Sequence, residues 1–290
     1  MKRFIINIFF IFFLTYIFGE LITRILGFRS QNMDFQVKGF ENNYSNQANS
    51  EGNFVFGKPP SLYKTKFRYN DIGFNTPLDL KDYNENKINV AFLGDSFVES
   101  LHVNYYESFS SILMAESDDI QSYEFGFHEY NIEDYIWLYD IYNLEKFDYV
   151  FVIFDINDIQ SNPNRLVYNQ EKERFRDIYN KFHFFNFLNR NHNLIRNFKK
   201  MIYGNSDTIK SSKNIILENH HKKFLKKENL FVIPRDNVSF KFFEENKIKN
   251  SIKIDFNLKQ IDFGKMDEHW NVKGRRMVIK SLMPYIDYKN

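Results

Sequence analysis

The chain has 290 residues, 43% of them hydrophobic, which is enough for one α/β domain with a sizeable core plus additional segments. Its 39 basic and 37 acidic residues give a formal net charge of +2, so no basic surface for nucleic acid is expected. The absence of cysteine excludes disulfide bonds, a thiolate nucleophile and metal sites with thiolate ligands.

The N-terminal segment is the most continuous apolar stretch of the chain. Lys2 and Arg3 precede an apolar run from Phe4 to Gly19, which residues 21–26 extend. No small-x-small cleavage site follows, so residues 1–28 are predicted to be an uncleaved signal anchor rather than a cleaved signal peptide. The cationic start predicts a cytoplasmic N-terminus, with the rest of the chain in the periplasm or outside the cell.

The next segment is polar and has little apolar periodicity. Residues 29–62 are rich in Asn, Ser, Gln and Gly, and they are predicted to form a linker with a short strand at Asn53 to Phe56. The stretch from Lys64 to Phe74 alternates and contains a turn-like Asn-Asp pair, which predicts a short hairpin. We place the main domain at residues 63–290.

From Lys87 onward, short apolar runs alternate with helical patterns. This alternation predicts an α/β domain, a three-layer α/β/α sandwich with parallel strands and right-handed crossovers. Strands are predicted at residues 88–93, 122–125, 149–154, 230–233 and 252–256, and helices at residues 107–116, 132–144, 184–202 and 272–286. The run YVFVIF at residues 149–154 is unbroken, so it is predicted to be central in the sheet.

Residues 160–228 are predicted to be an insertion after the third strand. This position would let the insertion cover, as a lid, a site at the ends of the strands. Near its end, the pair His220-His221 is compatible with a metal site or a contact with an anionic surface. A solvated helix or a mobile insertion is the simpler interpretation.

Three segments carry groups suited to acyl chemistry, and in open parallel sheets such groups gather at the carboxyl ends of the strands. The first strand runs into a Gly-Asp-Ser triplet that ends at Ser96, where backbone N–H groups at a helix start can stabilise an anion. Asn157 follows the third strand, and its amide is a neutral donor suited to an oxyanion. Asp267 precedes His269 in front of the last helix, and a nearby acid can orient an imidazole that acts as a base.

Each of these groups taken alone also fits a turn, a helix cap or a structural histidine. The other six histidines of the chain are interpreted as structural; they are residues 102, 128, 183, 192, 220 and 221. His269 differs from them because it has an acid close by and stands in a loop before a helix.

Together, the order and spacing of these segments resemble the SGNH/GDSL hydrolase superfamily, in its exported, membrane-anchored bacterial branch. The resemblance covers about residues 65–287 and implies a flavodoxin-like parallel sheet with no metal and no cofactor. It implies a catalytic triad of Ser96, His269 and Asp267. It also implies an oxyanion hole formed by the N–H groups of Ser96 and Gly126 and by the amide of Asn157.

Two positions depart from the usual pattern of the superfamily. Asp155 stands where a glycine is usual, and its charge would oppose an oxyanion unless it points away or is paired. Asp267-Glu268-His269 shortens the usual Asp-x-x-His spacing by one residue. This shorter version is similar to a block in alginate O-acetylation proteins, which also brings acyl transfer into consideration.

The resemblance therefore implies a serine esterase that acts outside the cytoplasm on acyl esters, expected to be acetyl esters, of carbohydrate or lipid. Two alternatives stay open: an O-acyltransferase that modifies an envelope polysaccharide, and a noncatalytic binding or scaffold protein of the same fold. The expected partners are an acylated carbohydrate or lipid substrate and the membrane, which the N-terminal helix would enter. No nucleic-acid partner is expected.

Overall fold

The computed structural model describes residues 2–27, 30–31, 36–38, 44–58, 61–128, 130–159, 184, 217–254, 261–264 and 267–286. The chain divides into two compact units. The first comprises residues 1–34, 54–64 and 165–212, and the second comprises residues 35–53, 65–164 and 213–290. Apart from Phe184, the predicted helix at residues 184–202 lies outside the described residues, as does most of the predicted insertion.

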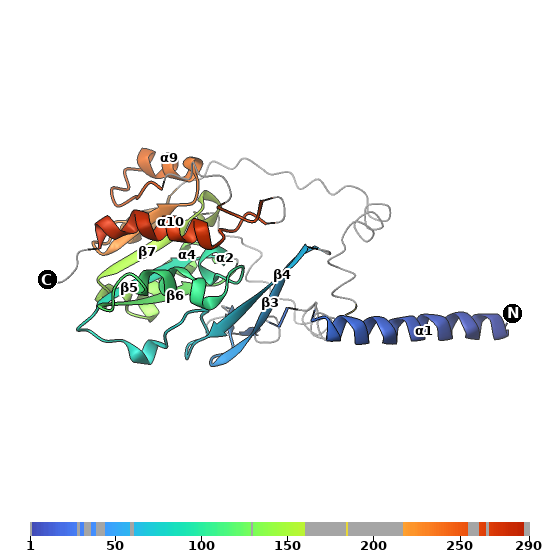
Figure 1. Ribbon diagram of the computed structural model, residues 1–290. Helices are drawn as coiled ribbons and strands as arrows, with labels where there is room; N and C mark the ends of the chain where they lie inside the picture. Colours follow the sequence, from blue (N-terminus) through green and yellow to red (C-terminus); the bar gives the residue numbers. More distant parts are fainter. Residues whose placement is uncertain are drawn as a thin grey trace. The chain divides into compact units, whose positions relative to one another are not determined.

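The N-terminal helix α1 spans Lys2–Ile25 (Figure 1). Its stretch Arg3–Ile25 has a mean hydropathy of 2.2, and none of its most apolar window is buried. The length and composition suffice to cross a membrane, although a signal sequence meets the same criterion. Its phenylalanines are widely exposed, as at Phe9 (75%) and Phe12 (71%).

Two small sheets follow α1 in the sequence. Strands β1 (Gln36–Lys38) and β2 (Tyr44–Asn46) pair antiparallel, and β3 (Ser50–Lys58) pairs with β4 (Ser61–Tyr69). The strand predicted inside the linker is therefore longer than expected. β4 pairs with this earlier strand rather than starting a hairpin of its own.

The turn expected after Tyr69 is present, but the return strand is reduced to a single bridge between Tyr69 and Asn75. The side chain of Asn70 organises this turn by accepting hydrogen bonds from the backbone N–H groups of Ile72 (3.2 Å) and Phe74 (2.9 Å).

A parallel sheet of four strands forms the centre of the second unit, in the order β6-β5-β7-β8. Its strands are β5 (Ile88–Gly94), β6 (Ile120–Gly126), β7 (Tyr149–Phe154) and β8 (Leu230–Pro234). These confirm four of the five predicted strands and the central place of residues 149–154. The predicted fifth strand is wrong for its described part, because only Ser251 makes a bridge, to Val232, and residues 252–254 form no strand.

The helices of this unit agree with the predicted alternation. The α-helices are α2 (Ser96–Glu99), α3 (Phe109–Met114), α4 (Ile132–Ile141), α8 (Asn219–Phe224), α9 (Asn237–Glu245) and α10 (Val272–Leu282). Short 3₁₀ turns are η3 (Leu80–Asp82), η4 (Tyr105–Glu107), η5 (Leu144–Lys146), η6 (Ile156–Ile159) and η9 (Met283–Tyr285). The helix α9 is absent from the prediction.

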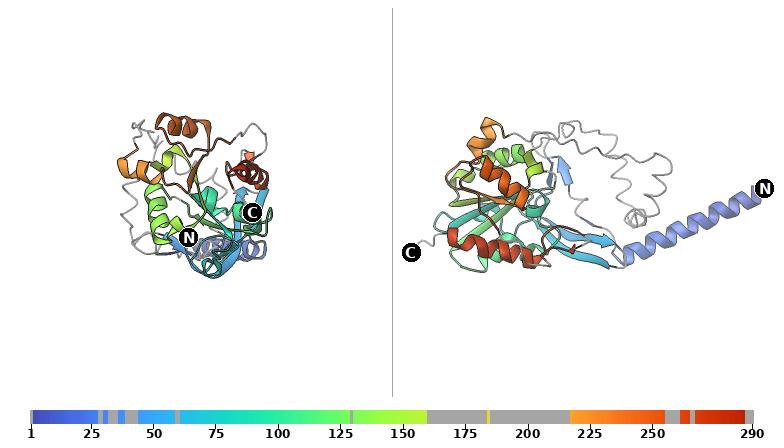
Figure 2. Two further views of the ribbon diagram at one scale, coloured as in Figure 1. Left: turned by 90° about the vertical axis from the view of Figure 1, so that its left-hand side faces the viewer. Right: turned by 90° about the horizontal axis from the view of Figure 1, so that it is seen from above.

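Each face of the central sheet carries its own hydrophobic cluster, because successive side chains of a strand point to opposite faces. Leu93 and Val152 belong to the cluster that α4, α8 and α9 cover. Phe92 and Ile153 belong to the cluster that α2, α3 and α10 cover. Helices thus pack on both sides of a sheet that is buried from β5 to β8, as Figures 1 and 2 show. This burial explains why these strands are continuous apolar runs rather than alternating ones.

Candidate active site

Ser96 stands where the buried strand β5 gives way to the short helix α2. Asp95 caps this helix, because its carboxylate accepts a hydrogen bond from the backbone N–H of Phe97 at 2.9 Å. α2 ends after one turn at Ser100, which has a left-handed backbone (φ 63°). The serine is therefore half-buried at the carboxyl end of a central parallel strand, the edge at which sites gather in open α/β sheets.

Gly126 is needed where it stands because the backbone of α2 lies directly against it. A Cβ atom at this position would lie 2.3 Å from the backbone nitrogen of Glu99 and 2.4 Å from the carbonyl carbon of Val98. Any larger residue would push α2, and Ser96 with it, away from the sheet. Packing alone therefore gives Gly126 a role at this edge.

His269 comes from the loop in front of α10, and several contacts fix that loop. Asn271 caps α10 by accepting a hydrogen bond from the N–H of Gly274 at 3.1 Å, as predicted for this helix. The backbone N–H of Asn271 donates to Ile261, and Trp270 is buried with its ring edge-on to Phe97 at 5.1 Å. The indole thus anchors the loop to α2 immediately beside the histidine.

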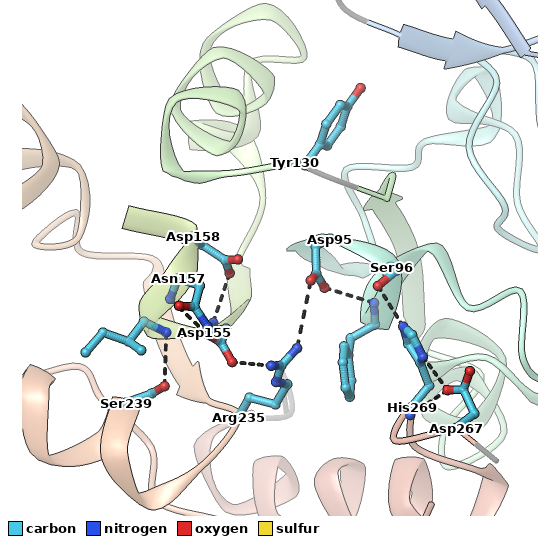
Figure 3. A network of polar contacts seen from close by, with 12 residues as sticks. Asp95, Ser96, Tyr130, Asp155, Asn157, Asp158, Arg235, Ser239, Asp267 and His269 are labelled. Atoms are coloured by element: carbon cyan, nitrogen blue, oxygen red, sulfur yellow. Dashed lines mark hydrogen bonds and ion pairs between the residues drawn. The ribbon is translucent and has the colours of Figure 1, made fainter. Parts of the chain in front are cut away.

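The structure brings Ser96, His269 and Asp267 together in one hydrogen-bonded chain (Figure 3). Ser96 Oγ lies 2.7 Å from His269 Nε2, and His269 Nδ1 lies 2.5 Å from Asp267 Oδ1. The same carboxylate oxygen accepts the backbone N–H of His269 at 2.9 Å. This two-residue turn lets the short Asp-x-His spacing direct the carboxylate to the ring.

The charge state of Asp267 sets the tautomer of His269. Burial alone would raise the pKa of Asp267, but hydrogen bonds from His102 and from the ring and backbone of His269 outweigh burial and hold this pKa well below its ordinary value. An ionised carboxylate only accepts, so Nδ1 of His269 carries hydrogen. A neutral ring then presents the lone pair of Nε2 to the hydroxyl of Ser96, as a general base must.

Asp155 is paired by Arg235, a residue that the sequence analysis missed. The guanidinium forms an ion pair with Asp155 Oδ2, and its Nη1 lies 4.0 Å from Asp95 Oδ2. It also lies 4.4 Å from the ring centroid of Phe97. The sequence contained one signal for this residue. Arg235 directly follows β8 and therefore lies at the same edge of the sheet as the other groups.

The structure does not bring Asn157 to Ser96. The side-chain amide of Asn157 donates to Asp155 Oδ1 at 2.6 Å, and its backbone N–H donates to the same oxygen at 2.8 Å. In Figure 3, Asp95 and Arg235 stand between Asn157 and Ser96. In this arrangement Asn157 orients Asp155 toward Arg235.

His102 is the second residue that the sequence analysis missed. Its Nε2 lies 3.3 Å from Asp267 Oδ2, and its ring stacks on the ring of His269 with centroids 3.9 Å apart and planes 11° apart. The interpretation of His102 as structural took no account of these neighbours. They are separated from it by more than 160 positions in the sequence.

His220 and His221 both contact the carboxylate of Glu133 on α4. The Nε2 atoms of both rings lie within 2.9 Å of Glu133 Oε1. The backbone N–H of Glu218 donates to His221 Nδ1 at 3.3 Å, so the hydrogen of a neutral His221 ring is on Nε2. A metal ion would need the lone pair of that nitrogen, so the geometry favours a hydrogen-bonded tie between α4 and α8 over a metal centre.

Comparison with known proteins gives weak structural similarities. No protein-family model and no curated protein matches the chain. A lipolytic protein of the G-D-S-L family from Desulfitobacterium hafniense DCB-2 is 13% identical, with a TM-score of 0.38, and the match covers 69% of this chain and 100% of that one. A protein of the same lipolytic family from Veillonella parvula DSM 2008 is 13% identical, with a TM-score of 0.34 and coverage of 68% and 96%. A catalytic mutant of an acetylxylan esterase from Geobacillus stearothermophilus is 15% identical, with a TM-score of 0.33 and coverage of 69% and 94%. The assignment of a function therefore rests on the geometry of the site.

Proposed function

We propose that the chain is a serine esterase of the SGNH/GDSL type, with a three-layer, flavodoxin-like domain. The observation that carries this proposal is the hydrogen-bonded chain from Ser96 Oγ through His269 to Asp267. A hydroxyl, an imidazole and an ionised carboxylate in this order are the parts of an activated serine nucleophile.

In the proposed reaction, Ser96 Oγ attacks the carbonyl carbon of an ester while His269 Nε2 takes the hydroxyl proton. Asp267 stabilises the imidazolium that forms. When the tetrahedral intermediate collapses, the C–O bond to the alcohol breaks and His269 returns the proton to the leaving oxygen. Water then attacks the acyl-serine by the same route, which releases the acid and restores the enzyme.

The proposed donors to the oxyanion are the backbone N–H groups of Ser96 and Gly126 and the amide of Asn157. Such donors stabilise the charge that develops on the carbonyl oxygen, and each is typically worth about 10²–10³-fold in rate. Asn157 would reach the oxyanion only after its amide turns away from Asp155. The two backbone donors are near each other in the fold, because Gly126 is aligned with Gly94 at the ends of β6 and β5, and Ser96 follows Gly94 by two residues.

We further propose that the substrate is an acyl ester, with acetyl as the expected group, of a carbohydrate or lipid outside the cytoplasm. The support is the helix α1, which is long and apolar enough to anchor the chain in a membrane. Its cationic start favours a cytoplasmic N-terminus. The substrate would then be met in the periplasm or outside the cell.

Hydrolysis of p-nitrophenyl acetate by the full-length chain in detergent tests the proposed activity. We expect Ser96→Ala and His269→Ala each to lower kcat/KM by about 10⁴-fold or more. Ser281→Ala is the matched control, since this serine lies on α10 and bonds the carbonyl oxygen of Met277. Wild-type hydrolysis no faster than that of Ser96→Ala would refute the esterase. Faster turnover with an added glycan acceptor would indicate the acyltransferase instead.

A further inference from the structure

We propose that His102 is a positioning residue of the site, which holds the second carboxylate oxygen of Asp267 and packs face to face on the ring of His269. The inference rests on the proposed function, because it gives His102 a part in the same reaction. Its basis is that the two carboxylate oxygens of Asp267 contact two different imidazoles. Oδ1 contacts Nδ1 of His269 at 2.5 Å, and Oδ2 lies 3.3 Å from Nε2 of His102.

The contact fixes which nitrogen of His102 carries hydrogen. Asp267 is ionised and can only accept, so the Nε2 atom of His102 must be the donor. A carboxylate held at both oxygens cannot rotate about its Cβ–Cγ bond without losing a hydrogen bond. His102 therefore fixes the plane in which Asp267 presents Oδ1 to His269.

The backbone around His102 is itself held in place, so the ring is a fixed support. Leu101 and Val103 are buried on either side of it, at 5% and 2% exposure. The hydroxyl of Thr65 donates to the carbonyl oxygen of Leu101 at 2.5 Å. The backbone N–H of Lys66 donates to the side chain of Asn104 at 2.9 Å. Both bonds tie this loop to β4.

The stacked ring of His102 also restricts His269. The two ring planes are 11° apart, and Phe97 stacks on His269 as well, with centroids 4.6 Å apart. An imidazole bounded in this way cannot turn about its χ2 bond to exchange its nitrogens. Nε2 then stays directed at Ser96 through both proton transfers.

The charge state of His102 suits this role. The charged groups that face it are Asp267, His269 and, from α10, Arg275. Burial lowers the pKa of His102, and the hydrogen bond to Asp267 only partly offsets this effect. A neutral His102 orients the carboxylate without cancelling its charge. A protonated His102 would stand face to face with the imidazolium that must form on His269, and would oppose it.

The test measures how fast Ser96 in the full-length chain reacts with an alkyl fluorophosphonate. In this reaction a bond forms between Ser96 Oγ and phosphorus, the P–F bond breaks, fluoride leaves and His269 takes the hydroxyl proton. His102→Gln keeps an N–H donor that reaches Asp267 but cannot titrate. His102→Phe keeps a flat ring but has no donor. His220→Gln removes a histidine outside the site and is the matched control.

We expect His102→Phe to slow labelling at pH 7.5 by about 10- to 100-fold, the range found when a hydrogen-bonding partner of a metal-bound histidine is removed. His102→Gln should restore the rate to within about tenfold of the wild type. Burial lowers the pKa of His102, so on acidification the wild-type rate should show an additional fall that the Gln variant lacks. The control should match the wild type in rate and pH profile.

Three results would overturn the role of His102. Labelling of the Phe variant at the wild-type rate would show that the donor is not needed. Equal losses in both variants, with an unchanged pH profile, would assign His102 to packing alone. The same fall on acidification in the wild type and the Gln variant would show that protonation of His102 does not affect the site. Absence of labelling in the wild type would instead refute the proposed function itself, so the two failures are distinguishable.

Discussion

The carboxylate of Asp267 accepts from three N–H groups, which come from the ring and backbone of His269 and from the ring of His102. These bonds explain why a spacing one residue shorter than usual for the SGNH/GDSL pattern still aligns the acid with the ring. The backbone bond closes a tight turn, and the turn places both contacts of His269 on one oxygen.

We expect Asp267→Asn to lower kcat/KM for p-nitrophenyl acetate by about 10²–10⁴-fold, because an amide can present hydrogen to Nδ1 of His269 and select the wrong tautomer.

The same substitution should also change the free energy of unfolding, by an amount that depends on pH. The pKa of Asp267 is lowered by folding, so its ionised form stabilises the folded chain above the ordinary value of 3.8. This contribution is lost progressively as the pH falls below 3.8.

Urea unfolding of the wild type and Asp267→Asn at pH 7 and at pH 2.5 measures this effect. The difference between their free energies of unfolding should be smaller at pH 2.5 than at pH 7. A difference that is the same at both pH values would contradict the lowered pKa.

Asp155 and Arg235 form an ion pair in the site. The effect of removing one of these charges on activity should therefore depend on whether the other is present. We expect Arg235→Gln to lower kcat/KM by about tenfold or more, since Asp155 then keeps a charge that opposes the oxyanion. Adding Asp155→Asn should restore most of the loss. Ester hydrolysis by both variants checks this, with the exposed Arg276→Gln as the control. Equal impairment of the single and double variants would contradict the pairing.

For single residues, the sequence predicts which side chains belong to the site and where they stand in the chain, but it does not predict their partners. Ser96 and His269 follow from a strand end and an acid-histidine loop. The partners of Asp155 and Asp267 are Arg235 and His102, which lie 80 and 165 positions away. Long-range pairing of side chains depends on the folded sheet, so no local pattern in a single sequence predicts it.

Among the elements, α10 is joined to β6 and to the end of α2 by buried polar groups. Arg275 on α10 is fully buried, and its Nη1 donates to Ser100 Oγ at 2.7 Å. Ser100 in turn donates to Glu124 of β6 at 2.7 Å. Burial lowers the pKa of Arg275 to about 10 and raises the pKa of Glu124. This network holds the helix that follows the His269 loop against the strand beside Ser96.

We expect Arg275→Met to lower the free energy of unfolding by about 3–5 kcal/mol, because it leaves Glu124 buried without its cation. Adding Glu124→Leu should recover much of this loss by removing the unpaired charge. Urea denaturation measures both variants, and Arg276→Met, an exposed neighbour on the same helix, is the control. A single variant as stable as the control would show that Arg275 does not compensate Glu124.

Strands that are long and apolar are predicted well from the sequence. Strands β5, β7 and β8 begin where predicted, because buried parallel strands are continuous apolar runs. The helix α9 was missed because polar residues interrupt its short apolar pattern. The expected hairpin was wrong in its pairing, because β4 pairs with β3, and the partner of a strand is set by the fold rather than by local alternation.

For the whole molecule, the alternation of strands and helices predicts the class of fold, and the charged apolar start predicts an anchor. We expect the full-length chain to stay in the membrane fraction after an alkaline carbonate wash and to be released by detergent. Its intact mass should include the residues of α1. A soluble chain that lacks this segment would show that the segment is a cleaved signal peptide.

The proposed activity depends most directly on the activation of Ser96 by His269. Intact-mass and peptide analysis after treatment of the folded full-length chain with a fluorophosphonate tests that activation. We predict a single adduct located on Ser96, no adduct in Ser96→Ala and much slower labelling in His269→Ala. A folded chain that gains no adduct, or gains one on another serine, would contradict the activation of Ser96.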